Sequence, residues 1–207
     1  MRKSLAKSPT VDTLLVFVAV FLAQQLLELL VPTAVGLFAL APPLSVRPWT
    51  VVTSVYAHSD LSHLAANSVA LAIIGVAVER TTTPFRFHVF FIATGATAGV
   101  VQIVMKGLIQ KPVPVLGASG AVFALLGYVI TGNRLASGLL SRLDVGPGAQ
   151  LLGFTVVAAV VTVATGSPGV ALIAHFTGFL VGLVAGRLAV LDPGATRNRR
   201  SENTTYK

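Results

Sequence analysis

The chain has 207 residues, of which 54% are apolar and only 11% are charged. Soluble domains carry about 25% charged residues, so this composition excludes an ordinary soluble protein and favours a polytopic membrane bundle. The absence of cysteine excludes disulfides, cysteine nucleophiles and thiolate metal sites. The net charge of +8 does not indicate nucleic acid as a partner, because the basic residues lie in tails and short loops.

Six apolar stretches are long enough to be drawn as transmembrane helices, which predicts an all-α membrane protein with six spans. In chain order they cover residues 13–31, 61–78, 87–105, 116–131, 150–165 and 170–190. We interpret the first as a retained helix, because it is longer than the apolar part of a signal peptide. The expected organisation is an N-terminal tail (1–12), a membrane domain (13–190) and a basic C-terminal tail (191–207).

The long connection at 32–60 contains four prolines, which forbid a continuous helix. Arg47 and Trp49 are typical of a segment that rests at the membrane interface. If the N-terminus is cytoplasmic, all but three of the 15 lysines and arginines fall on the cytoplasmic side. We therefore expect a multi-pass cell-membrane protein with both termini in the cytoplasm.

In this orientation the second, fourth and sixth stretches all run from outside to inside. Polar residues near their starts should then lie within about 10 Å of the outer edge of the hydrocarbon layer. Ser119, between Gly117 and Gly120, is one of these residues. A single serine among glycines is more often a packing residue than a nucleophile, so Ser119 alone is a weak candidate.

His175 is a stronger indication, because an ionisable side chain inside a membrane span usually has a function. Gly178, Gly182 and Gly186 follow on the same helical face, where small residues let another helix approach closely. We interpret His175 as the base that activates Ser119. The alternative is a packing histidine bonded to a neighbouring helix.

His63 and Asn67 are four residues apart and share one helical face. Both can donate hydrogen bonds, so beside a nucleophile they can stabilise an oxyanion together with the backbone N–H of Ser119. Ordinary interhelical bonding is the alternative. His58 precedes this helix and is expected at the membrane interface.

No metal or other cofactor is expected. His58 and His63 are five residues apart and do not share a face, and no acidic residue in the outer half of the membrane supports them. The only acidic residue expected on the outer side is Asp60, so a complete Ser-His-Asp triad is not expected either. The sequence predicts a Ser-His dyad.

Together these residues resemble the rhomboid family of intramembrane serine proteases. The serine motif reads Gly117-Ala118-Ser119-Gly120, the histidine motif reads Ala174-His175-Phe176-Thr177-Gly178, and His63 and Asn67 fit the family's H-x-x-x-N pattern. The resemblance implies a six-helix bundle of the prokaryotic type that uses Ser119 and His175 to cleave transmembrane protein substrates within membrane lipid. It also implies supporting roles for Gly117, Gly120, Phe123, Gly178 and Gly182.

Two positions depart from the family's pattern. Phe123 stands where many members have a tyrosine that packs against the histidine. Phenylalanine keeps the aromatic ring of this tyrosine and lacks its hydroxyl, and we expect activity to survive. Arg47-Pro48-Trp49 reverses the Trp-Arg order of many bacterial members.

The principal alternative is an inactive rhomboid-like protein that binds client helices. A small transporter fits less well, because polar residues are scarce in the inner halves of the second, fourth and sixth stretches.

Overall fold

The computed structural model describes residues 8–111, 113–132, 146–166 and 171–194. This part of the chain contains α1 (Pro9–Leu30), η2 (Ala34–Leu37), α2 (Thr50–Thr53), α3 (Leu61–Glu79), α4 (Pro84–Gly107), α5 (Ser119–Gly132), α7 (Pro147–Ala164) and α8 (Leu172–Arg187). Extended backbone pairs there only at one antiparallel bridge, between Leu40 and Val115. The all-α prediction is therefore confirmed for the described residues.

Helix length separates the apolar helices into two groups. Helices α1, α3, α4 and α7 are long and apolar enough to cross a membrane, whereas α5 and α8 have only 14 and 16 residues. At 1.5 Å per residue α5 is about 21 Å long, against a hydrocarbon layer of about 30 Å. The described helices are those of a multi-pass membrane protein, while the count of six spans stays a prediction.

Most helix boundaries differ by a few residues from those expected from the sequence, and three differences bear on the fold. Helix α1 begins at Pro9 rather than at residue 13, because Ser8 caps it and proline suits its first turn. Helix α5 begins at Ser119 rather than at residue 116, because Gly117 has a φ of +126° that a helix cannot contain. Leu191, assigned to the C-terminal tail, is buried in the core. Residues 1–7 and 195–207 of the expected tails lie outside the described residues.

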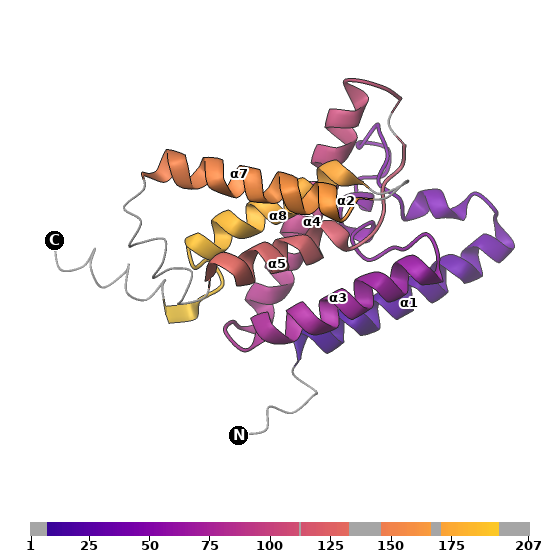
Figure 1. Cartoon of the computed structure of the whole chain (residues 1–207). Helices are drawn as coiled ribbons and strands as arrows, with labels where there is room; N and C mark the ends of the chain where they lie inside the picture. The colour runs from indigo at the N-terminus through magenta and orange to yellow at the C-terminus, as the bar shows by residue number, and fades with distance from the viewer. Residues whose placement is uncertain (1–7, 112, 133–145, 167–170, 195–207) are drawn as a thin grey trace, which may run out of the picture.

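Helix α5 is the centre of the bundle. It contacts α3, α4 and α8, and eight of its 14 residues are buried. Figure 1 shows α5 between α3 and α8, with α1 beside α3 and α7 beside α8, as the contacts between these pairs require. Helix α7, in contrast, buries only Ala158 and Thr162 and lies at the periphery.

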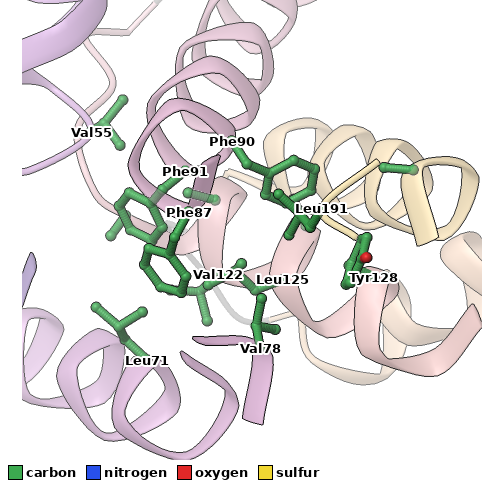
Figure 2. Close-up of a cluster of buried hydrophobic side chains, with 14 of the residues drawn as sticks. Val55, Leu71, Val78, Phe87, Phe90, Phe91, Val122, Leu125, Tyr128 and Leu191 are labelled. Atoms are coloured by element: carbon green, nitrogen blue, oxygen red, sulfur yellow. The ribbon is translucent and has the colours of Figure 1, made fainter. Parts of the chain in front are cut away.

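Large apolar side chains join α4 to α5. Phe87, Phe90 and Phe91 of α4 pack in one buried cluster with Val122 and Leu125 of α5 (Figure 2). Lipid tails are as apolar as these side chains, so close van der Waals packing holds the cluster together in a membrane rather than escape from water. The cluster therefore fixes α5 against α4 by shape.

Helices α5 and α8 approach each other through glycines. A Cβ atom added to Gly178 would overlap the carbonyl of Gly120, and one added to Gly182 would overlap the carbonyl of Ala124. From the opposite side, a Cβ on Gly127 would overlap the carbonyl of Phe179. The close-approach face predicted for the sixth stretch is thus confirmed, and α5 is the helix that approaches it.

A substitution at this contact tests its importance. Gly182→Ala should lower the free energy of unfolding in detergent by about 1–3 kcal/mol, because the added methyl group forces the two backbones apart. Gly153→Ala on α7 is the matched control, since nothing lies within 4 Å of its Cβ position. Equal unfolding free energies for the two variants, measured by denaturant titration, would contradict the packing described here.

Candidate active site

Ser119 is the first residue of α5 and follows a segment of non-helical backbone. Val115 in this segment exchanges two hydrogen bonds with Leu40, of 2.8 and 2.9 Å, and the N–H of Gly117 donates to the carbonyl of Ser54 at 2.8 Å. The first N–H groups of a helix have no partner within it. The segment therefore holds Ser119 where its hydroxyl and these N–H groups are available to a ligand.

A cavity of about 750 Å³ opens beside Ser119. Its walls include Ser119 and Phe123 of α5, His63 and Asn67 of α3, and His175 of α8. The structure thus brings together the predicted nucleophile, base and oxyanion donors from three helices far apart in sequence. The glycines predicted to support the site lie outside this cavity wall; they lie at the α5–α8 contact or beside the ring of His63.

His175 lies in the first turn of α8, and its ring stacks on Phe123 with centroids 4.4 Å apart and an interplanar angle of 29°. Its Nδ1 atom is buried and has no hydrogen-bond partner. No hydrogen bond joins Ser119 to His175 among the described residues. Such bonds are often long in sites without substrate and tighten when it binds.

His63 is held from several directions. Its backbone N–H donates to Asp60 at 2.8 Å, which caps α3, and its Nδ1 lies 3.1 Å from the hydroxyl of Ser59. A Cβ added to Gly117 would lie 2.7 Å from Nε2 of His63, so the ring needs a glycine there. One turn further on, Asn67 donates through Nδ2 to the carbonyl of His63 at 3.2 Å.

Among the described residues, Asp60 is the one acidic residue in the wall of this cavity. Hydrogen bonds from the hydroxyl of Ser62, the backbone N–H of His63 and the hydroxyl of Ser59 hold the pKa of Asp60 well below its ordinary value. Its carboxylate therefore carries a negative charge at neutral pH, at the mouth of the cavity.

His58, expected at the membrane interface, is buried inside the protein, with only 1% of its surface exposed. Gln24 of α1 holds its backbone, accepting from the N–H of His58 at 3.1 Å and donating to its carbonyl at 3.4 Å. The ring of His58 packs edge to face on His63, with centroids 5.1 Å apart. A polar Gln24 within an apolar span was the sequence signal for this contact.

Gln102 of α4 is a further residue that the motifs did not reveal. It is buried, and its Oε1 accepts a 3.0 Å hydrogen bond from the backbone N–H of Ala174, the residue before His175. The beginning of α8 is therefore tied to α4 at the level of the site. The only sequence signal was an amide side chain in a span whose one other strongly polar residue, His88, lies at its start.

The fold and this cavity define a multi-pass membrane protein with a serine and a histidine at one buried site. Residues 45–191 match the family model of the Rhomboid domain, and the chain belongs to the rhomboid family.

Several curated proteins share parts of the sequence. Rhomboid protease GluP of Bacillus subtilis is 38% identical over 89 residues, which cover 42% of this chain and 17% of that protein. RHOMBOID-like protein 5 of Arabidopsis thaliana is 27% identical over 147 residues, covering 70% of this chain and 45% of that protein. Inactive RHOMBOID-like protein 8 of the same plant is 26% identical over 83 residues, covering 40% and 22%. The chain thus spans less than half the length of these relatives.

The hydrogen bond to Gln102 can be tested with substitutions that keep a side chain of similar size. Gln102→Leu should lower the free energy of unfolding by about 1–3 kcal/mol, because the buried N–H of Ala174 loses its acceptor. Gln102→Glu keeps an acceptor oxygen and controls for the loss of the amide itself. Thermal unfolding in detergent measures both variants, and a Gln102→Leu protein as stable as wild type would refute the role of this bond.

The stack between Phe123 and His175 gives a second test. Phe123→Leu removes the ring and should slow modification of Ser119 by a fluorophosphonate about tenfold, a loss near the upper range of one aromatic pair. Phe123→Tyr keeps the ring and should react at nearly the wild-type rate. Equal rates for all three proteins would show that the stack does not orient His175.

Proposed function

We propose that this chain is an intramembrane serine endopeptidase that cleaves transmembrane segments of membrane proteins near their outer end. The observation that carries the proposal is the cavity that brings Ser119, His175, His63 and Asn67 together. Membership of the rhomboid family adds to it, since one relative is named a rhomboid protease.

In the proposed reaction, Oγ of Ser119 attacks a carbonyl carbon of the substrate while His175 takes the hydroxyl proton. His175 then gives this proton to the leaving amine, and the acyl group stays on Ser119 as an ester. Water hydrolyses the ester with His175 again as the base. The unpartnered Nδ1 of His175 fits a dyad, in which no carboxylate orients the base.

The developing oxyanion has donors on two sides. The N–H of Ser119 lies at the positive end of α5, and the ring of His63 lines the same cavity beside Gly117. Asn67 uses one amide proton for the carbonyl of His63 and keeps the other for the oxyanion. Removing one such donor typically costs about a hundredfold or more in turnover.

The positions of these residues support cleavage near the membrane surface. Ser119 lies at the first residue of α5, and Asp60 and Ser62 line the same cavity at the beginning of α3. With both termini in the cytoplasm, as the lysine and arginine distribution favours, this end faces outward and water enters from outside. A substrate helix must unwind locally there to expose a carbonyl group.

An inactive rhomboid-like protein that binds client helices is the second candidate, and the relative named as inactive keeps it open. The presence of both Ser119 and His175 in one cavity favours the protease. Fluorophosphonate modification of Ser119 that depends on His175 separates the two functions, because a binding protein needs no reactive serine.

Replacing the nucleophile gives the direct test. Ser119→Ala and His175→Ala should each lower cleavage of a tagged transmembrane substrate in proteoliposomes by about a thousandfold or more, since the members of a catalytic unit act together. Both variants should unfold at temperatures close to that of wild type, which controls for misfolding. Continued cleavage by pure, folded Ser119→Ala protein would rule the proposal out.

A further inference from the structure

Ser59 bridges a carboxylate and a histidine at the mouth of the cavity. Its Oγ donates to Oδ2 of Asp60 at 2.7 Å and lies 3.1 Å from Nδ1 of His63. The other carboxylate oxygen of Asp60 accepts from the hydroxyl of Ser62 and from the backbone N–H of His63. Asp60, Ser59 and His63 therefore form a chain of hydrogen bonds that ends on one nitrogen of the His63 ring.

The number of protons that these groups carry fixes the direction of the hydrogen bonds. An ionised carboxylate only accepts hydrogen bonds, and a serine hydroxyl has a single proton to donate. Because Ser59 gives that proton to Asp60, its oxygen must accept from His63. The chain therefore keeps the proton of a neutral His63 ring on Nδ1.

The other ring nitrogen lies next to the segment that leads into Ser119. Nε2 of His63 lies beside Gly117, two residues before Ser119, and its ring lines the same cavity as Ser119. In a neutral ring with the proton on Nδ1, Nε2 has a lone pair and cannot donate to an oxyanion. A second proton on Nε2 is needed for that role.

We propose that Asp60 and Ser59 are positioning residues that keep Nδ1 of His63 protonated, so that His63 meets the oxyanion as an imidazolium whose charge Asp60 balances. The proposal rests on the proposed protease function. The proton on Nε2 comes from solvent at the cavity mouth, and the proton of Ser119 still goes to His175. Charge-assisted hydrogen bonds of this kind are about twice as strong as neutral ones.

Other titratable groups also face His63 and enter the interpretation of any experiment. His58, from the segment before α3, packs on its ring with centroids 5.1 Å apart. His175 of α8 lines the same cavity, and its ring is stacked on Phe123. Neither provides a negative charge, so Asp60 is the only anion in the cavity wall that can balance an imidazolium at His63.

The tautomer of His63 can be measured by NMR on the full chain in detergent with ¹⁵N-labelled histidine, the signals being assigned with His63→Gln. In the resting wild-type protein we expect the one-bond N–H coupling on Nδ1. Asp60→Asn should move it to Nε2, because the new amide donates to Ser59 and frees the Ser59 hydroxyl to donate to Nδ1. This reversal is not expected if Asp60 only caps α3, since asparagine caps as well.

The rate of Ser119 modification by a fluorophosphonate measures the effect on reactivity. Ser59→Ala should slow it on the order of tenfold to a hundredfold, as removal of a partner that orients a functional histidine typically does. Ser59→Thr keeps the hydroxyl and should restore the rate. Ser62→Ala is the matched control, because Ser62 also bonds Asp60 but has no bond to the ring of His63.

Two results would overturn the proposal: a resting His63 protonated on Nε2 but not on Nδ1, or a Ser59→Ala protein that reacts as fast as Ser62→Ala. Failure of the proposed function is distinguishable from both. If Ser119 is not a nucleophile, no variant is modified, yet the tautomer of His63 is still read directly by NMR.

Discussion

The contact between the backbones of α5 and α8 sets the geometry on which the site depends. Gly178 and Gly182 of α8 lie on carbonyl groups of α5, and Gly127 of α5 lies on a carbonyl group of α8. In lipid there is little hydrophobic force between helices, so this interlocking of surfaces determines both their distance and their register. Ser119 begins one of these helices and His175 lies in the first turn of the other. Their relative position is therefore a property of two rigid elements, which is how a site can hold reacting groups within the narrow limits that catalysis needs.

The late start of α5, at Ser119, has a cost in hydrogen bonds that the first half of the chain offsets. Non-helical backbone at membrane depth is tolerated only where protein covers it or where it lines a water-filled cavity. The backbone before Ser119 meets this requirement through Leu40 and through Ser54, which accepts from Gly117. Both partners belong to the long connection between α1 and α3. The connection between α1 and α3 thus satisfies the backbone that presents the serine.

Local patterns were enough to predict the helices and the polar residues that meet in the cavity, because helical periodicity and span length are visible in a short window of sequence. The start of α5 was misplaced, because the φ of Gly117 reflects a close approach to His63 from another helix. The burial of His58 was missed for a similar reason. Its partner Gln24 is 34 residues away, and only the folded chain pairs them. The sequence indicates such a contact only by an amide side chain in an apolar span. This pattern does not identify the partner residue or the role of the contact.

The two histidines of the cavity have surroundings suited to opposite tasks. A base must offer a lone pair to the hydroxyl of Ser119, and His175 lies on the apolar face of Phe123 with no anion to hold it in a charged form. A donor to an oxyanion must carry a proton on the nitrogen that faces the substrate, and His63 has a carboxylate within its hydrogen-bond chain. When titratable groups in one site have such different neighbours, the neighbours identify the acid and the base. The proposed role of His63 then depends as much on Ser59 and Asp60 as on its own place on α3.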